Sequence, residues 1–583
     1  MNYLRGVRPN GHGGTLVLNS NAPRRRWVAI FATVAAMALV ASSCSSDDNT
    51  TGSGASTTTP ADEGQPKAGG SVVYGLEAET LGGWCPQSAQ LAAGGIQVAG
   101  AIYDTLTAPN EKGDYVPYLA KSITPNAEYT EWTIGLRSGI KFHNGEDLNA
   151  DIVKRNLDGY LSGILFGLVL ADINEVTVAD PMTVKVTTRI PWVAFPAHLW
   201  GSGRLGIAAA EQLDAGPDCQ RKLIGTGPFK LVEWRPNDRL VAEKNPQYWQ
   251  KDENGVQLPY LDQITFRPQE NTSQLVSGLK GGQYDLIHLT DGKEISRLRQ
   301  DSQVKLLEST RSAEVGHVML NASKPPFNNI NARLAVAYAT DADELNRVHE
   351  AGIHKLAKQP YAAETLGYQE DPGFPEYNLE RAKEFVAKYK QETGQDLRFE
   401  LDTTPDPATQ ALAASHKAQW EEAGIVANIV APTEQSQYIS VGIAGSYEGI
   451  LWRNFPGGDP DTLYYWWHEK AWNDETQAFD KPNLTNFGRI NDPEIDAALE
   501  AGRSEPDRAT REGYYQTIGK EFATGAYNIW TWYSTWGFAG KTDVNGVIAP
   551  NLPGDGDAPV TTNGDERGLP IASVQPVVGL WRG

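Results

Sequence analysis

Short runs of β-branched and aromatic residues alternate with longer stretches of helical periodicity along most of the chain. Ser71–Tyr74 and Thr183–Thr188 have the composition of strands, whereas Ala332–Tyr338 and Leu379–Tyr389 have the apolar spacing of helices. No unit of about 20 to 50 residues is repeated. The pattern predicts a protein of the α/β class.

Individual segments allow sharper predictions. In Trp132–Leu136 large apolar residues alternate with Thr and Gly, as in a half-buried strand, and Asn144-Gly145 predicts a tight turn. Asn149 and Asp492-Pro493 are typical of helix starts. In Trp530–Trp536 alternate residues are tryptophan or serine, so a single strand here would place its tryptophans on one side.

The first 44 residues have the pattern of an export signal. Arg24–Arg26 precede an apolar run, Trp27–Val40, and small residues follow it directly before Cys44. The run is shorter than the roughly 20 residues that a membrane-spanning helix needs, so we expect cleavage. The segment resembles a bacterial lipoprotein signal, which implies that Cys44 is lipidated; a signal peptide with an incidental cysteine is the alternative.

Residues 45–70 are mostly Ser, Thr, Gly, Asp and Pro, with no aromatic or large aliphatic residue, which predicts a flexible tether. Removal of residues 1–43 would leave 540 residues, enough for two or three domains. It would also change the net charge from −21 to −26, because the leader holds five basic residues and no acidic one. Such acidity argues against a nucleic acid or an anionic membrane surface as partner.

With Cys44 assigned to a lipid, Cys85 and Cys219 remain as one pair in an exported chain. We expect them to form a disulfide, since export leads to an oxidising compartment. Two unrelated buried thiols are the alternative.

A specific resemblance rests on Trp132–Gly145 followed by Asn149–Val153. Further matching segments lie on both sides of it along the chain: Tyr103–Leu106, Pro117–Ser122, Gly225–Phe229, Asn245–Trp249, Gly282–Asp285, Pro325–Asn328 and Gly458–Asp461. Together they resemble the extracellular solute-binding proteins of the peptide/nickel/opine class, which serve ABC importers. The matches extend over roughly residues 68 to 540.

The resemblance implies a periplasmic-binding-protein-like fold, with two α/β lobes joined by a hinge and a third lobe inserted into the first. The expected parts are a signal peptide at 1–43, a lipidated tether at 44–67, a first lobe at 68–103, 224–313 and 536–583, an inserted lobe at 104–223, and a distal ligand-closing lobe at 314–535.

The sequence gives no sign of a catalytic centre. His349 and His354 are five residues apart, whereas the zinc-protease motif places its histidines four apart. Neither a Gly-x-Ser-x-Gly elbow nor a P-loop occurs, and the other histidines are scattered singly. We expect no enzyme activity, no metal site and no cofactor.

The ligand question centres on Trp452–Asp461. In the peptide-binding proteins that it resembles, an aspartate shortly after the equivalent tryptophan binds the peptide ammonium group, but Phe455-Pro456 occupies that stretch here. Asp459 and Asp461 match the turn that follows. A buried ammonium without an anionic partner would be costly, which favours a non-peptide ligand unless Asp459 takes over.

Aromatic side chains nearby are suited to stacking on sugars, rings or cations. The expected ligand-binding residues are Trp452, Phe455, Asp459, Asp461, Tyr464, Tyr465 and Trp466.

These observations predict a monomeric lipoprotein at the outer face of the cytoplasmic membrane. By resemblance it would capture an oligopeptide in an interlobe cleft and deliver it to an ABC permease powered by a separate ATPase. Three alternatives remain: the same role for a glycoside, an opine-like compound or an aromatic acid; a solute-sensing receptor; and a secreted hydrolase of the cell envelope.

Overall fold

A computed structural model describes residues 63–548 and 573–583, except for 80–82, 86–87, 90, 111–113, 164–165, 432–434, 455–456, 474, 477 and 484. The expected signal peptide, residues 44–62 of the expected tether, and Phe455 therefore lie outside the described residues; Cys44 is among them. Within the part that is described, no helix is both long enough and apolar enough to span a bilayer.

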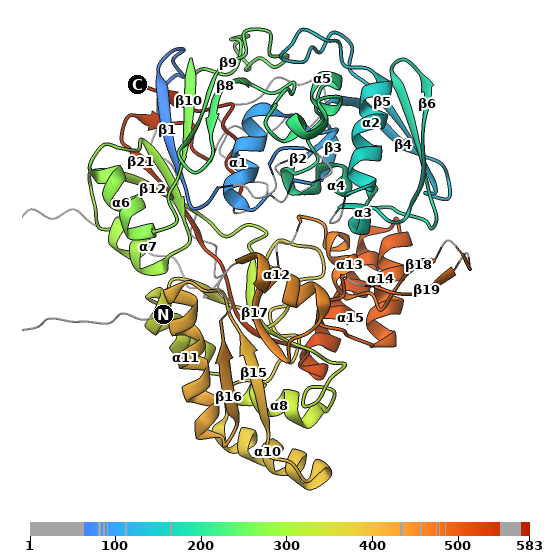
Figure 1. Cartoon of the computed structure of the whole chain (residues 1–583), viewed down its shortest axis with the longest axis vertical. Helices are drawn as coiled ribbons and strands as arrows, with labels where there is room; N and C mark the ends of the chain where they lie inside the picture. Colours follow the sequence, from blue (N-terminus) through green and yellow to red (C-terminus); the bar gives the residue numbers. More distant parts are fainter. Residues whose placement is uncertain are drawn as a thin grey trace, which may run out of the picture. The chain divides into compact units, whose positions relative to one another are not determined.

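A seven-stranded sheet, in the order β12-β21-β11-β1-β10-β9-β8, combines distant parts of the chain (Figure 1). Its strands are β12 Val304–Ser309, β21 Trp536–Lys541, β11 Leu286–Leu289, β1 Ser71–Leu76, β10 Gln263–Pro268, β9 Arg239–Lys244 and β8 Phe229–Arg235. The central β1 is parallel to both neighbours. The short pair β22 Val544–Asn545 and β23 Trp581–Arg582 and the helices α1 Ala93–Ile102, α6 Thr272–Lys280 and α7 Gly292–Leu298 accompany this sheet.

A four-stranded antiparallel sheet, in the order β4-β5-β7-β6, has a hydrophobic core of its own. Its strands are β4 Ala120–Pro125, β5 Glu131–Leu136, β7 Thr183–Thr188 and β6 Ile173–Asp180. The elements around it are β2 Thr107–Pro109, β3 Tyr115–Pro117, α2 Ala150–Leu161, α3 Phe166–Val169, α4 Phe195–Trp200, α5 Ala210–Leu213 and two 3-10 turns, Gly201–Gly203 and Gly216–Gln220.

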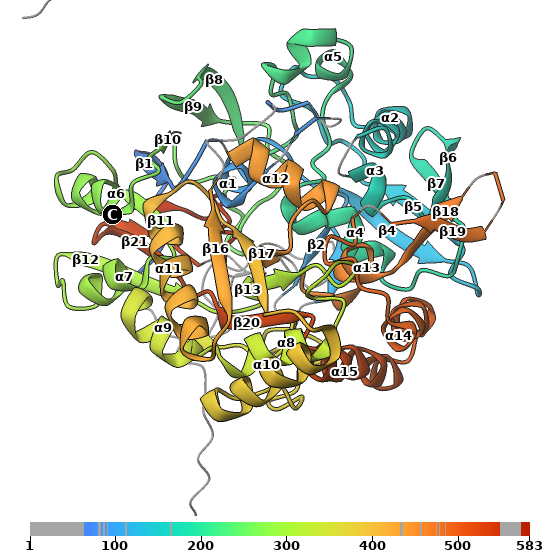
Figure 2. The ribbon, with the colours of Figure 1, turned by 60° about the horizontal axis from the view of Figure 1, so that its bottom comes forward.

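A six-stranded mixed sheet, in the order β14-β20-β13-β17-β15-β16, forms the third part (Figure 2). Its strands are β14 Lys355–Leu356, β20 Asn528–Tyr533, β13 Val315–Leu320, β17 Gly449–Asn454, β15 Arg398–Asp402 and β16 Val426–Val430. The same part contains α8 Ile330–Tyr338, α9 Ala342–Glu350, α10 Leu379–Thr393, α11 Pro407–Glu422, α12 Gln435–Ala444, the 3-10 turn Pro460–Leu463, α13 Tyr464–Trp467, β18 Lys470–Asn473, β19 Ala478–Pro482, α14 Pro493–Ser504 and α15 Arg508–Gly525.

We use "first lobe", "inserted lobe" and "distal lobe" for the parts that carry the seven-, four- and six-stranded sheets; the residue boundaries expected above stay a prediction. The chain passes twice between the first and distal lobes, at residues 310–314 from β12 to β13 and at residues 534–535 from β20 to β21. We call these two segments the crossings. They are the connections about which the two lobes would turn.

The α/β class and several local predictions are confirmed. β5 buries Trp132, Ile134 and Leu136 in strict alternation. Asn149 Oδ1 accepts the Ile152 N–H at 3.0 Å at the start of α2. Asp492 caps α14, which begins at Pro493.

Two other segments differ in outcome. Gly225 lies where a Cβ atom would come within 2.1 Å of the Ile102 carbonyl oxygen, so the segment leading into β8 requires a glycine there. A single strand over Trp530–Trp536 is wrong, because β20 ends at Tyr533 and β21 begins at Trp536 in a different sheet.

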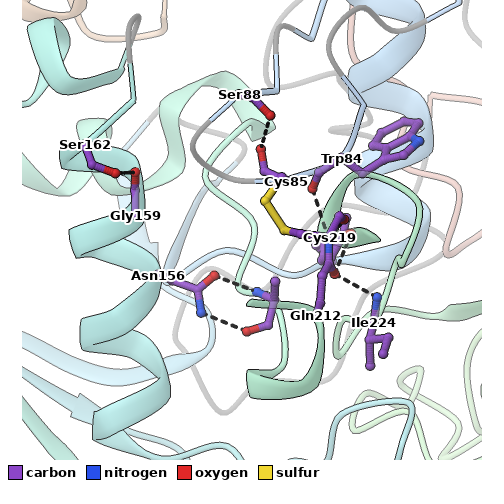
Figure 3. The surroundings of a disulfide bond; sticks show 11 residues. Trp84, Cys85, Ser88, Asn156, Gly159, Ser162, Gln212, Cys219 and Ile224 are labelled. Carbon is purple, nitrogen blue, oxygen red and sulfur yellow. Dashed lines mark hydrogen bonds between the residues drawn. A yellow bond between two sulfur atoms is a disulfide. The ribbon is translucent and has the colours of Figure 1, made fainter. Parts of the chain in front are cut away.

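The expected disulfide between Cys85 and Cys219 is confirmed, and it joins the first lobe to the inserted lobe (Figure 3). The fully buried Gln212 side chain fixes the surrounding backbone. Its amide nitrogen donates to the Trp84 carbonyl at 3.1 Å, and its oxygen accepts the Ile224 N–H at 2.9 Å. The two halves of the crosslink are therefore held by hydrogen bonds as well as by the sulfur atoms.

Candidate ligand-binding site at the chain crossings

The two crossings are hydrogen-bonded to each other. The Ser534 N–H donates to the Glu314 carbonyl oxygen at 2.9 Å, and the next amide, that of Thr535, donates to His354 Nδ1 at 3.1 Å. The carboxylate of Glu314 therefore originates at the junction of the first and distal lobes, where a ligand held by both lobes would lie.

Four charged side chains influence one another electrostatically at this junction, and we call them the crossing charge cluster: Glu77, Arg204, Glu314 and Arg453. Glu77 follows β1 directly, Arg204 belongs to the inserted lobe, and Arg453 is on β17. Arg453 Nη1 lies 3.4 Å from Glu314 Oε2. Charges from all three lobes thus influence Glu314.

Exposure differs sharply within the crossing charge cluster. The Glu314 side chain is 3% exposed and that of Arg453 is 45% exposed. Both carboxylate oxygens of Glu314 are buried, and neither accepts a hydrogen bond from any residue that the structure describes. Burial raises the pKa of Glu314 to about 7; Glu77 raises this pKa further, whereas Arg453 and Arg204 lower it. Glu314 therefore exchanges its proton near neutral pH.

The neighbouring histidine is neutral. The Glu77 N–H donates to His288 Nε2 at 3.1 Å, so that nitrogen carries no proton. Burial lowers the pKa of His288, although the Glu77 carboxylate opposes this effect. The positive charges of the crossing charge cluster are those of the arginines.

Five aromatic side chains of the distal lobe form an aromatic group: Tyr438, Trp452, Tyr465, Trp466 and Phe487. Trp452 stacks on Tyr438 with ring centroids 5.3 Å apart, and the Phe487 ring is nearly perpendicular to both tryptophan rings. Trp452, Tyr465 and Trp466 are only partly buried. They retain surface on which a ligand could stack.

Tyr465 connects the aromatic group to the crossing charge cluster. Burial raises the pKa of its hydroxyl to about 12, and Arg204 of the inserted lobe limits this rise. Trp452 precedes Arg453 in β17. Because successive side chains of a strand point to opposite faces, the link between the aromatic group and the crossing charge cluster is the electrostatic interaction of Tyr465 with Arg204.

The carboxylate of Asp461 has a different environment. It is fully buried and accepts hydrogen bonds from Trp192 Nε1 at 2.7 Å, His198 Nε2 at 2.9 Å and Arg503 Nε at 3.0 Å. Arg503 also binds Asp172. These five side chains form a lobe-contact network that joins the inserted lobe to the distal lobe, where Figures 1 and 2 show α4 beside α13.

Charge is balanced by close partners in the lobe-contact network. Burial opposes ionisation of Asp461, but Arg503 and His198 outweigh it and lower the pKa of this carboxyl. The guanidinium carbon of Arg503 lies 3.5 Å from the centre of the Tyr464 ring, and Tyr464 is 5% exposed. The carboxyl pKa of Asp172 is raised by burial, with Arg503 acting in the opposite direction.

Asp459 is also engaged within the protein. Its carboxylate receives two hydrogen bonds from Arg511, at 2.7 and 2.6 Å, and its Oδ1 accepts the Asp461 N–H at 2.9 Å. Next to it, the Gly458 N–H donates to the Tyr115 hydroxyl of the inserted lobe at 2.8 Å. The turn that contains both aspartates therefore contacts the inserted lobe.

The structure thus divides the residues that the sequence suggested. It groups Trp452, Tyr465 and Trp466, whereas it places Asp459, Asp461 and Tyr464 against Arg511 and Arg503. Sequence reasoning missed Glu77, Arg204, Glu314 and Arg453. Only Arg453 had a signal, its position next to Trp452.

A comparison with known proteins identifies the class of protein to which these lobes and crossings belong. Residues 114–475, more than half of the chain, match the model described as "Bacterial extracellular solute-binding proteins, family 5 Middle". The protein belongs to the family 5 bacterial extracellular solute-binding proteins.

Two relatives are glutathione-binding proteins GsiB. The Escherichia coli protein is 27% identical over 57% of this chain and 64% of its own length; that of Pectobacterium atrosepticum is 28% identical over 45% and 51%. The chain thus spans less than two thirds of either relative.

Solved structures share the fold. DppA from Helicobacter pylori in complex with the peptide STSA has a TM-score of 0.72 and 22% identity, covering 82% of this chain and 95% of DppA. The agropinic acid complex of AgaA from A. tumefaciens R10 has a TM-score of 0.70 and 23% identity, covering 82% of this chain and 94% of AgaA.

Proposed function

We propose that this protein is the substrate-binding component of an ABC importer. It captures a solute between the first and distal lobes, closes about the crossings and delivers the solute to a membrane permease driven by a separate ATPase. The observation that carries the proposal is the buried Glu314 carboxylate, with Arg453 3.4 Å away, at the crossings of a family 5 solute-binding chain. Its own role involves no catalytic step.

Oligopeptides are the first candidate ligands, because the GsiB relatives bind glutathione and the DppA structure contains a peptide. A non-peptide solute such as an opine-like compound is the second. Phe455-Pro456 replaces the expected aspartate, Asp459 is held by Arg511, and the AgaA neighbour contains agropinic acid.

For either ligand we propose that Trp452, Tyr465 and Trp466 form the stacking surface. Asp459, Asp461 and Tyr464 then act indirectly, by holding the distal lobe on the inserted lobe. The proposed anchor is a lipid on Cys44, which would place a monomeric protein at the outer face of the cytoplasmic membrane.

A calorimetric screen of the full-length protein tests the function. The panel contains a free tripeptide, its N-acetylated form, glutathione, agropinic acid, a methyl glycoside and an aromatic acid. We expect saturable binding of at least one member; no binding of any would contradict the proposal.

Trp452→Ala should weaken binding about ten- to a hundred-fold. Tyr377→Ala, at an exposed position outside the site, is the matched control.

A further inference from the structure

Glu314 is the one member of the crossing charge cluster whose side chain is more than nine-tenths buried, and its two carboxylate oxygens accept no hydrogen bond from any described residue. Buried carboxylates ordinarily receive several hydrogen bonds, since desolvation without them is costly. Arg453 lies at ion-pair distance, 3.4 Å, without making a hydrogen bond to it. The carboxylate thus has acceptor positions to offer.

The backbone around Glu314 is held in place at the crossings. Its own carbonyl oxygen ties the first crossing to the second through Ser534, and the following residue, Val315, pairs with Asn454 at the end of β17. Glu314 is therefore fixed by backbone contacts on two sides. Its side chain lies within the electrostatic influence of charges from all three lobes.

We infer that Glu314 is a specificity-determining residue, which accepts hydrogen bonds from a protonated nitrogen of the bound solute. This inference rests on the proposed function. A primary ammonium or a guanidinium would supply the donors that the carboxylate lacks, and the buried charge pair would be stronger than one in water. A solute without such a nitrogen would leave the carboxylate unsatisfied and would be bound more weakly.

The surroundings set the dependence on pH. The charged groups that influence Glu314 are Arg453, Glu77 and Arg204, and burial together with Glu77 raises its pKa to about 7. The pKa of the nearby His317 is lowered by burial to about 4, so this ring stays neutral between pH 5 and 7.5. As pH falls from 7.5 to 5, Glu314 gains a proton and a cationic solute loses its partner.

The test compares matched ligands by calorimetry on the full-length protein: a free tripeptide with its N-acetylated form, and agmatine with N-butylurea. Variants are Glu314→Gln, Glu314→Asp and the control Glu380→Gln, whose side chain is 84% exposed. Circular dichroism and thermal unfolding check that each variant is folded.

We expect the wild type and Glu380→Gln to prefer the cationic member of at least one pair, and Glu314→Gln to reduce that preference at least about tenfold. Glu314→Asp should retain part of it. Affinity for the cationic ligand should fall between pH 7.5 and 5, while that for its neutral partner stays constant.

Two results overturn the inference while the proposed function stands: binding of neutral ligands with no preference for a cation, or a preference that Glu314→Gln leaves unchanged. Binding of no ligand in these pairs or in the screening panel overturns both. If Glu314→Gln is unfolded, the pH profile and Glu314→Asp decide, since a constant preference in both contradicts the inference.

Discussion

The lobe-contact network and the crossing charge cluster each contain a buried carboxylate with arginines near it at a junction between lobes, yet the two carboxylates differ in their partners. Asp461 accepts three hydrogen bonds from charged or polar side chains, and its pKa is lowered although the site is fully buried. Glu314 accepts none from the described residues, and its pKa is raised to about 7. A satisfied network holds structure together, whereas an unsatisfied one is suited to a ligand.

The largest expected effect is in the lobe-contact network. Arg503→Met should leave Asp461 and Asp172 buried without their cation, which typically costs about 3–5 kcal/mol. Urea denaturation should show this loss of stability. Arg508→Met, whose arginine is 67% exposed, should change stability by less than about 1 kcal/mol. An unchanged Arg503→Met protein would show that the network is not a structural contact.

In the crossing charge cluster, removal of a charge should raise the stability of the protein. Because the folded-state pKa of Glu314, about 7, exceeds its usual 4.5, the folded protein binds the extra proton and loses stability as pH rises from about 4.5 to 7. Glu314→Gln removes this loss. The variant should be more stable than the wild type at pH 7.5, by up to roughly 3 kcal/mol, with a flatter pH dependence.

Thermal unfolding at pH 5, 6 and 7.5 measures this difference, with Glu380→Gln as the exposed control. A Glu314→Gln protein that is less stable than the wild type at pH 7.5 would place Glu314 among the structural charges.

The smallest effect concerns Asp459. The sequence suggested it as a ligand-binding residue, whereas the structure pairs it with Arg511. Asp459→Asn weakens the paired contact with Arg511, so we expect a loss of about 1.5–3 kcal/mol in stability. Ligand affinity should hardly change. Calorimetry with the ligand that the panel identifies separates the two roles, and Asp371→Asn, at a 70% exposed position, serves as control. A tenfold loss of affinity in a variant of unchanged stability would show that Asp459 contacts the ligand.

Local chemistry made much of the fold predictable. The cap at Asn149 and the alternation in β5 depend on neighbours within a few residues. The break after Tyr533 was not predictable in this way, because the alternation of Trp530–Trp536 continues although the chain changes sheets.

The candidate site was predictable only in part, and for the same reason. The aromatic side chains of the distal lobe are close in sequence, so their grouping was visible. By contrast, Asp461 meets Trp192 across 269 residues, and no local pattern marks such a partner. Glu314 can be recognised as a candidate ligand-binding residue only from the structure, because it is the structure that shows that no described residue donates a hydrogen bond to its carboxylate.

The strand order of the first lobe has a consequence for the biogenesis of an exported chain. β21, from residues 536–541, lies between β11 and β12, although more than 220 residues separate it from either along the chain. Until this late segment has been translocated, β11 and β12 have open edges that can pair with other chains or be recognised by proteases. The seven-stranded sheet is therefore completed only after residues 536–541 have been translocated, and a chain that terminates before them keeps exposed strand edges that proteases can recognise.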